Sequence, residues 1–192
     1  MSEFPCESII LDACSVINLY ASGYMRNILE SIPKQVTVAA YVLYEESNRI
    51  YTGPLDDPTK ETEPINLQSL IDDNLIRVVS LESETEENWV IKFSSVRRVD
   101  TGEAITAAIA VHRQWSLATD DRNALSFFMR SEPPLHLIST LDLLKCWVDT
   151  THPQRAIVST MLENVQRRAR YKPHDQHHLY RWWECYKGKN RY

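Results

Sequence analysis

The chain is poor in glycine and has no glycine-rich phosphate loop. Only 4 of its 192 residues are glycine, and neither G-x-G-x-x-G nor G-x-x-x-x-G-K-S/T occurs. Such loops need glycine because the backbone must approach the phosphate closely. We therefore do not expect a nucleotide-binding domain of this type. A receiver domain is not expected either, because the lysine that it needs after a late strand is not in place.

Long apolar runs and clustered cysteines are also missing. The N-terminal segment has no basic leader, and Asp12 interrupts its apolar stretch, so we expect neither a signal peptide nor a membrane span. The protein is accordingly expected in the cytoplasm. The cysteines lack the spacing of a metal site, which indicates reduced thiols at Cys6, Cys14, Cys146 and Cys185.

Charge is divided unevenly along the chain. Residues 1–151 carry 12 basic and 23 acidic side chains, whereas residues 152–192 carry 9 basic and 3 acidic ones. The acidic body argues against phosphate binding over the whole surface, but the basic tail can supply it locally. Charge alone therefore leaves nucleic-acid binding open.

Short apolar runs rich in β-branched residues alternate with helical patterns. This alternation predicts an α/β fold in which helices cover both faces of a parallel sheet. The segment 41–50 has a helical pattern, and 52–64, rich in Pro, Asp, Glu and Thr, is typical of a solvated loop. The predicted strands span residues 8–11, 36–40, 75–81, 115–119 and 136–139.

The length and pattern predict one compact domain with an appended C-terminal part. Residues 8–149 hold the alternating pattern, and residues 150–192 form a helical extension that is basic and aromatic.

Acidic residues follow several of the predicted strands. Asp12 ends the first strand, and Asp120–Asp121 end the fourth. Glu45–Glu46 follow the second strand, and Glu103 opens the helical pattern before the fourth. In an open parallel sheet the functional crevice lies beyond the carboxyl ends of the strands, so we expect these acids to meet there.

Each of these acids also has a structural interpretation. Asp12 and Asp120–Asp121 can be N-caps of the helices that follow them. Asp100 and Glu103 fit the D-x-x-E pattern of a capping box. Glu45–Glu46 can form a solvated helix face, and since helical neighbours point about 100° apart, at most one of them can face the site.

Taken together, the acids indicate a divalent metal site. Carboxylates that share a partly dry pocket need a compensating cation. Hard oxygen ligands suit Mg²⁺ or Mn²⁺, and sites of this type activate water and stabilise phosphoryl oxygens during hydrolysis.

Four motifs follow one another along the chain: LDACSVINL, V-x-x-E at Val42–Glu45, TGEAITAAIAV and ATDDRNA. In order and spacing they resemble the PIN-domain family, the ribonuclease fold best known from toxins of bacterial toxin–antitoxin pairs. The resemblance covers roughly residues 8 to 149. It implies a three-layer α/β/α sandwich around a parallel sheet and Mg²⁺- or Mn²⁺-dependent endonucleolytic cleavage of RNA.

The resemblance also assigns site residues by position. The four family acids fall on Asp12, Glu45, Glu103 and Asp120, which would be catalytic metal ligands, and Asp121 is a further candidate ligand. If the chain is a toxin, an inhibitory antitoxin protein would cover the crevice, and PIN domains often form homodimers.

Two hydroxyl residues are candidates to support the ligands. Thr119 matches the hydroxyl residue that precedes the late acids. The family often has Ser or Thr two positions after the first acid, but Cys14 stands there and Ser15 follows. The helix that opens with Gly102 and Glu103 resembles only a subset of the family.

The extension has two interpretations. Its cations and aromatic rings can bind RNA. Alternatively, Met161, Leu162 and Val165 share one helical face and dock, with the tryptophans, onto the body or a second copy; this interpretation is preferred. The candidate RNA-binding residues are Arg167, Arg168, Arg170, Lys172, Tyr180, Arg181, Trp182, Trp183, Lys187, Lys189 and Arg191.

A catalytically silent PIN-fold module that binds protein or RNA is the alternative function. The acids would then be caps or structural ligands, but the presence of all four family acids argues against it. A zinc site at His174, His177, His178 and Cys185 is not expected, because these residues lack the paired spacing of such sites.

Overall fold

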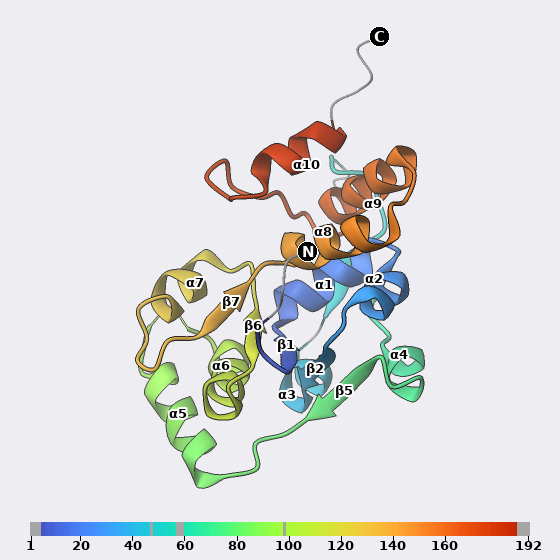
Figure 1. Cartoon of the computed structure of the whole chain (residues 1–192). Helices are drawn as coiled ribbons and strands as arrows, with labels where there is room; N and C mark the ends of the chain where they lie inside the picture. The colour runs from blue at the N-terminus through green and yellow to red at the C-terminus, as the bar shows by residue number, and fades with distance from the viewer. Residues whose placement is uncertain (1–4, 47, 57–59, 98, 188–192) are drawn as a thin grey trace.

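A five-stranded parallel sheet forms the centre of the molecule (Figure 1), with the strand order β5-β2-β1-β6-β7. The computed structural model describes residues 5–46, 48–56, 60–97 and 99–187. The predicted fold class is confirmed. The strands are β1 (Ser8–Leu11), β2 (Gln35–Ala39), β5 (Ile76–Val79), β6 (Ser116–Ala118) and β7 (His136–Ile138).

The central strand β1 aligns the ends of its two neighbours. All its residues are buried, as in strands covered by helices on both faces. Its last residue, Leu11, lies opposite Val38 of β2 and Ala118 of β6. These three strands therefore end near one edge of the sheet, and the residues that follow them are neighbours in space.

Helices on both faces of the sheet complete the three-layer sandwich. Helices α1, α2 and α8 pack against one another on one face, and α3 and α5 pack against α6 on the other (Figure 1). The helices are α1 (Ala13–Ala21), α2 (Met25–Ser31), α3 (Ala40–Tyr44), α4 (Gln68–Asp72), α5 (Glu84–Ser94), α6 (Thr101–Arg113), α7 (Arg122–Phe128), α8 (Thr140–Thr151), α9 (Arg155–Arg168) and α10 (Tyr180–Lys187).

A β-hairpin replaces part of the predicted helix 41–50 and of the predicted loop 52–64. Strand β3 (Arg49–Tyr51) pairs antiparallel with β4 (Thr62–Pro64). The helix ends early because the Asn48 side-chain amide donates to the Val42 carbonyl (2.6 Å), and the chain then turns Ile50 into the interior, where it is fully buried. Burial of this side chain favours the strand over the local helical pattern.

The C-terminal extension docks onto the body of the same chain. In α9 the side chains of Met161, Leu162 and Val165 are fully buried, and they belong to the same core as the sheet residues. Trp183 of α10 is also fully buried and meets the Tyr171 ring edge-on, with 6.0 Å between ring centroids. This confirms the preferred interpretation of the extension, namely that its apolar face docks onto the body of the chain.

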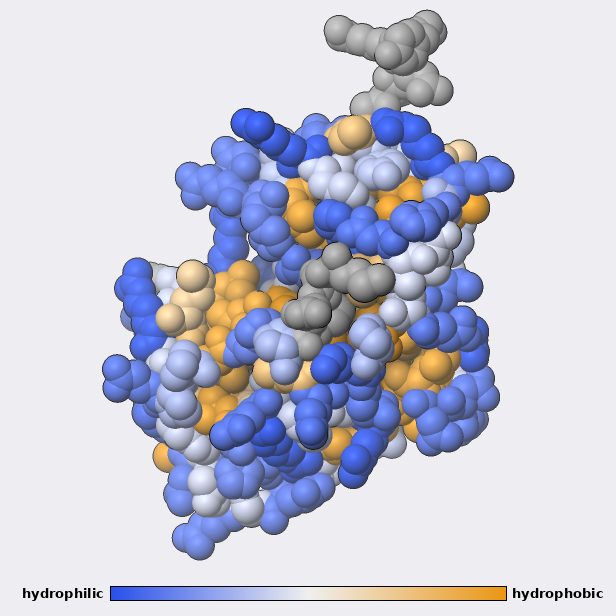
Figure 2. Space-filling model, viewed as in Figure 1, coloured by the Kyte–Doolittle hydropathy of each residue, from blue (hydrophilic) through white to orange (hydrophobic). Residues whose placement is uncertain are grey.

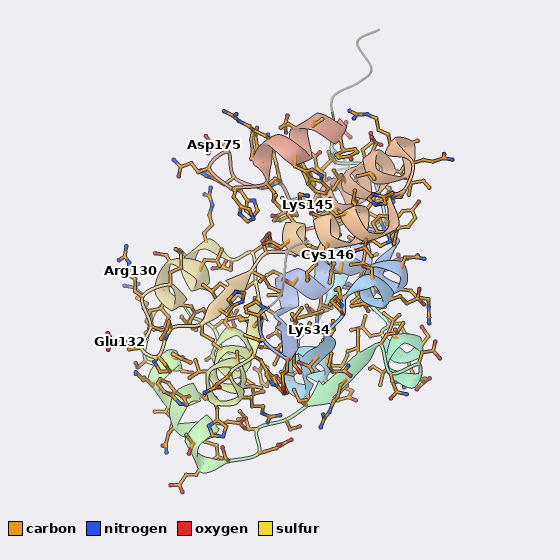
Figure 3. All side chains as sticks on the ribbon, viewed as in Figure 1. Lys34, Arg130, Glu132, Lys145, Cys146 and Asp175 are labelled. Carbon is orange, nitrogen blue, oxygen red and sulfur yellow. The ribbon has the colours of Figure 1, made fainter. Side chains whose placement is uncertain are left out.

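The face of the molecule seen in Figure 2 is mainly polar. Figure 2 shows a largely hydrophilic face with smaller apolar areas between the charged side chains, and Arg130, Glu132 and Asp175 point away from the ribbon in Figure 3. Among the described residues, no helix has the length and apolar character needed to cross a bilayer.

Replacing Trp183 with Ala is expected to lower the free energy of unfolding by about 3–5 kcal/mol, because the ring fills the space between the extension and the core. Urea denaturation measures this change. Trp182 is the matched control, since it is only half-buried and packs edge-on against Tyr186. Equal losses for Trp182→Ala and Trp183→Ala would contradict the docking.

The ion pair of Glu86 and Arg113 joins α5 to α6. Arg113 donates from Nε to Oε1 (2.7 Å) and from Nη2 to Oε2 (3.2 Å) of Glu86, which is fully buried. Burial raises the pKa of Glu86, but the hydrogen bonds from Arg113 and from the Glu82 N–H outweigh it and leave that pKa below its usual value. The pair therefore stabilises the fold when Glu86 is ionised.

Replacing Glu86 with Gln is expected to cost about 2–3 kcal/mol of stability at pH 7. Because the folded pKa is lowered, the wild-type contribution is complete above the unfolded pKa and is lost as the pH falls through the folded value. The variant should therefore lose less stability on acidification than the wild type. Thermal melts over a pH series measure this, with exposed Glu87→Gln as the control.

Candidate functional site

Asp12 directly follows the carboxyl end of β1, the central strand of the sheet. Its N–H donates to the Ala118 carbonyl (3.0 Å), so it continues the ladder between β1 and β6. Its side chain is nearly buried, with 4% of its surface exposed, and its Oδ2 accepts from the Thr119 hydroxyl (3.0 Å) and the Cys14 thiol (3.3 Å). Burial raises the pKa of Asp12 despite these hydrogen bonds.

Four other carboxylates surround this position. Asp12, Glu46, Asp100, Glu103 and Asp121 are called here the acidic cluster. Burial and the charges of Asp100 and Asp12 raise the pKa of Glu46 to about 7. Burial, Asp100, Asp12 and Asp121 likewise raise the pKa of Glu103 to about 7, against the hydrogen bond from the Asp100 N–H. The cluster therefore combines burial with mutual repulsion.

The start of α6 brings Asp100 and Glu103 together through a capping box. The Glu103 N–H donates to Asp100 Oδ1 (2.8 Å), and the Asp100 N–H donates to Glu103 Oε2 (2.9 Å). The predicted capping box is therefore confirmed. Because the helix N-terminus carries partial positive charge, it also favours carboxylates in this place.

Gly102 permits Glu46 to approach the start of α6. A Cβ atom at Gly102 would lie 1.6 Å from Glu46 Oε1, so any other residue there would displace this carboxylate. Gly102 thus leaves the space that the Glu46 carboxylate occupies.

Of the neighbouring pair after β2, the structure brings Glu46 to the cluster and leaves Glu45 outside it. Glu45 is exposed, forms the C-cap of α3 and lines a different surface pocket with Tyr41, Val79 and Ile105. The structure therefore places Glu46, and not the predicted Glu45, among the other acids. The sequence limits the site to one of the two, and the end of α3 at Tyr44 decides which one.

Asp120 and Asp121 also have different surroundings. Asp120 turns to the other side of the chain, where it accepts from the Asn18 amide (2.9 Å), the Thr140 N–H (3.2 Å), the Thr140 hydroxyl and the Tyr171 hydroxyl (3.2 Å). Burial raises the pKa of Asp120, against these hydrogen bonds. Asp120 is thus occupied by a structural network.

Asp121 lies near Glu103, whose pKa its charge helps to raise. Thr119, two residues before it, bonds to Asp12, and Asp121 adds to the electrostatic field at Glu103. Asp121 Oδ1 also caps α7 by accepting from the N–H groups of Asn123 and Ala124.

The two predicted hydroxyl residues serve different carboxylates. Thr119 supports Asp12, whereas Ser15 is buried and accepts from the Thr140 hydroxyl (3.4 Å), on the Asp120 side. Cys14 lies between the two acids: its thiol donates to Asp12 and accepts from the Asp120 N–H (3.2 Å). A thiol therefore bridges the segments that carry Asp12 and Asp120.

Three arginines that were candidates for RNA binding hold the β3–β4 hairpin instead. Arg167 donates to the Thr52 carbonyl (3.2 Å), and Arg168 donates to Glu63 Oε1 (2.9 Å). Arg170 donates to the Pro54 carbonyl (2.7 Å) and stacks on Tyr51. These side chains are engaged within the chain.

The other candidates in the extension divide by exposure. Lys172 and Arg181 are exposed, and Tyr180 and Trp182 are half-buried. Trp183 is fully buried, so the prediction that it stacks on bases is wrong. Lys189 and Arg191, and the side chain of Lys187, lie outside the part of the chain that the structure describes.

The acidic cluster has no cation of its own among the described residues. None of its five carboxylates forms an ion pair there, and no cation is among the main causes of the pKa shifts of Asp12, Glu46 and Glu103. In residues 5–46, 48–56, 60–97 and 99–187, no three His, Cys, Asp or Glu side chains are arranged as a preformed metal site.

The carboxylates of the acidic cluster suit Mg²⁺ or Mn²⁺ better than an ion that needs a closed set of protein ligands. Mg²⁺ is held in many enzymes by one or two carboxylates, retained waters and substrate phosphate, so it does not require a closed set of protein ligands. When such an ion binds, it stabilises the ionised form of partly buried carboxylates that have no cation beside them.

No protein-family model matches the chain, and no curated protein matches it. The site is therefore interpreted from its own geometry.

Replacing Gly102 with Ala is expected to displace the Glu46 carboxylate without unfolding the protein. The end of a flexible side chain moves at low cost, and Ala favours a helix over Gly by about 0.5–1 kcal/mol. The melting temperature should therefore change little, while calorimetry should show weaker Mn²⁺ binding. A large loss of stability with unchanged Mn²⁺ affinity would contradict this account.

Proposed function

We propose that the chain is a metal-dependent endoribonuclease of the PIN type, with Mg²⁺ or Mn²⁺ as its cofactor. The observation that carries this proposal is the acidic cluster. Its carboxylates come from separate segments of the chain and converge at the carboxyl edge of a parallel sheet, where no described cation balances them. The order of the four sequence motifs, which resembles that of PIN domains, supports the same function.

The residues of the cluster have distinct tasks in this proposal. Asp12 and Asp121 would hold the ion, with Glu46 and Glu103 completing its surroundings directly or through water. A bound ion of this type neutralises phosphate charge and makes water a better nucleophile. Thr119 orients Asp12 through its hydrogen bond (3.0 Å), and Asp100 orients Glu103 through the capping box. Asp120, Asn18 and Thr140 keep the end of β6 in place.

RNA binding requires cations near an acidic site. Arg122 follows Asp121 directly and is exposed, and Lys172 and Arg181 are exposed in the extension. These cations can bind phosphates that flank the cleaved bond. In the toxin form of the proposal, the chain acts in the cytoplasm, forms a homodimer and is inhibited by an antitoxin protein that covers the acidic cluster.

The test is cleavage of labelled RNAs and single-stranded DNA by the purified chain with Mg²⁺, Mn²⁺ or EDTA. We expect metal-dependent cleavage of RNA and a loss of about 100-fold or more in Asp12→Asn and Asp121→Asn. Asn preserves the cap of α7, so Asp121→Asn separates metal binding from capping. Glu103→Gln similarly preserves the capping box.

Neighbouring residues provide matched controls. Glu46→Gln should reduce cleavage and Mn²⁺ affinity, whereas Glu45→Gln should leave both unchanged. Asp120→Asn should lower the melting temperature more than the Mn²⁺ affinity, because the new NH2 group replaces an oxygen that accepts two of the four hydrogen bonds. A wild type that neither cuts nucleic acid nor binds Mn²⁺ would reject the nuclease and favour the catalytically silent module.

A further inference from the structure

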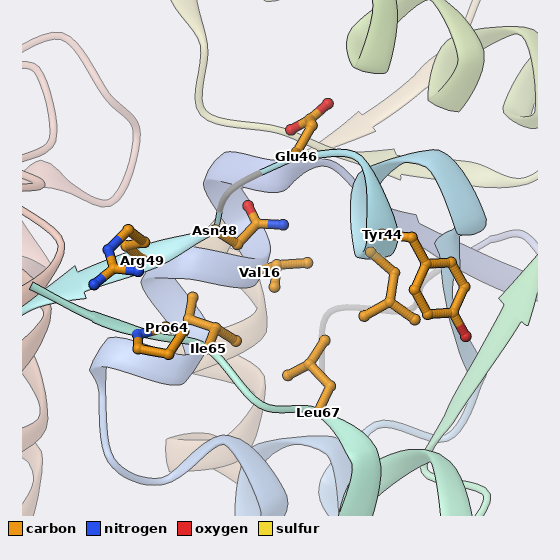
Figure 4. A pocket seen from close by; sticks show the side chains of 9 residues that line it. Val16, Tyr44, Glu46, Asn48, Arg49, Pro64, Ile65 and Leu67 are labelled. Carbon is orange, nitrogen blue, oxygen red and sulfur yellow. The ribbon is translucent and has the colours of Figure 1, made fainter.

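A cavity of about 270 Å³ lies next to the acidic cluster (Figure 4). It is enclosed by α1, the end of α3 and the segment that follows the β3–β4 hairpin. Glu46 lines this cavity and also belongs to the acidic cluster. A group bound in the cavity would therefore lie beside the position of the scissile phosphate.

The walls of the cavity combine apolar and polar side chains. Val16 and Leu67 are almost completely buried, and Leu43, Pro64 and Ile65 add apolar surface that a flat ring can contact. The polar side chains of the lining are those of Glu46, Asn48 and Arg49. Pockets for drug-sized ligands measure about 300–1,000 Å³, so a cavity at or below this range fits a single planar group. A nucleobase has this size and shape.

Asn48 provides a fixed acceptor at the rim. Its Nδ2 donates to the Val42 carbonyl (2.6 Å), which leaves Oδ1 as the free polar atom of the amide. Within the described residues no donor reaches this oxygen, which turns toward the Glu46 side of the cavity in Figure 4. An acceptor held in this way selects a ring that carries an N–H group.

Tyr44 adds an aromatic face at the mouth. It lines the cavity, and 71% of its surface is exposed, which is unusual for a large hydrophobic side chain. Exposed aromatic rings beside nucleic-acid sites stack on unpaired bases. In Figure 4 the Tyr44 ring lies at the rim and turns away from Asn48, so a base that enters the cavity would meet it at the rim.

We propose that this cavity binds one unpaired nucleobase of the RNA substrate, next to the scissile phosphate, through Tyr44 and the Asn48 oxygen. This inference rests on the proposed function and adds its substrate subsite. It implies that the enzyme acts on single-stranded RNA, because a paired base cannot enter the cavity.

The test uses uncharged nucleosides, so it depends on neither metal binding nor cleavage. The full chain in EDTA is titrated with adenosine, and NMR follows the Asn48 side-chain amide and the Ile65 N–H. We expect saturable shifts at both groups. Tyr44→Ala should weaken binding about fivefold or more, whereas Tyr44→Phe should retain it. Purine riboside, which lacks the amino group, should bind about fivefold more weakly than adenosine.

Met129→Ala is the matched control, since Met129 is 74% exposed but lies on α7 and does not line the cavity. It should bind adenosine like the wild type. Absence of shifts at Asn48 and Ile65, or shifts that Tyr44→Ala leaves unchanged, would overturn the subsite. Metal-dependent cleavage without nucleoside binding would reject the subsite alone, whereas nucleoside binding without cleavage or Mn²⁺ binding would reject the nuclease.

Discussion

The burial of Asp12 at the end of the central strand is the constraint on which the rest of the site depends. Its N–H belongs to the ladder with β6, so the side chain has a fixed position at the sheet edge. A buried carboxylate needs donors, and the described residues supply the Thr119 hydroxyl, the Cys14 thiol and the Ala13 N–H. The neighbouring acids oppose its ionisation. A positively charged group at this end of the sheet would therefore stabilise the ionised form of Asp12.

The start of α6 combines a structural and a functional task. The capping box satisfies N–H groups of the helix and at the same time fixes the direction of Glu103. Gly102 leaves room for Glu46, whose carboxylate closes the cluster on the side of the neighbouring cavity. Capping and the proposed metal binding would use different oxygen lone pairs, so the two tasks are compatible.

The extension shapes the region around the site from a distance. Arg167, Arg168 and Arg170 hold the β3–β4 hairpin, and the segment after this hairpin supplies Ile65 to the cavity. Tyr171 bonds to Asp120, behind the cluster. Most of the basic residues described in the extension therefore contribute through the fold, and Lys172 and Arg181 are its cations directed to solvent.

The sequence by itself determined the alternation that gives the parallel sheet, the capping box at Asp100 and the gathering of acids at the ends of strands. Only the tertiary structure decided between Glu45 and Glu46 and between Asp120 and Asp121. Adjacent side chains point in different directions, and that direction depends on where a strand or helix ends. The end of α3 in turn depends on a contact between Asn48 and Val42 and on the burial of Ile50, which local patterns do not contain.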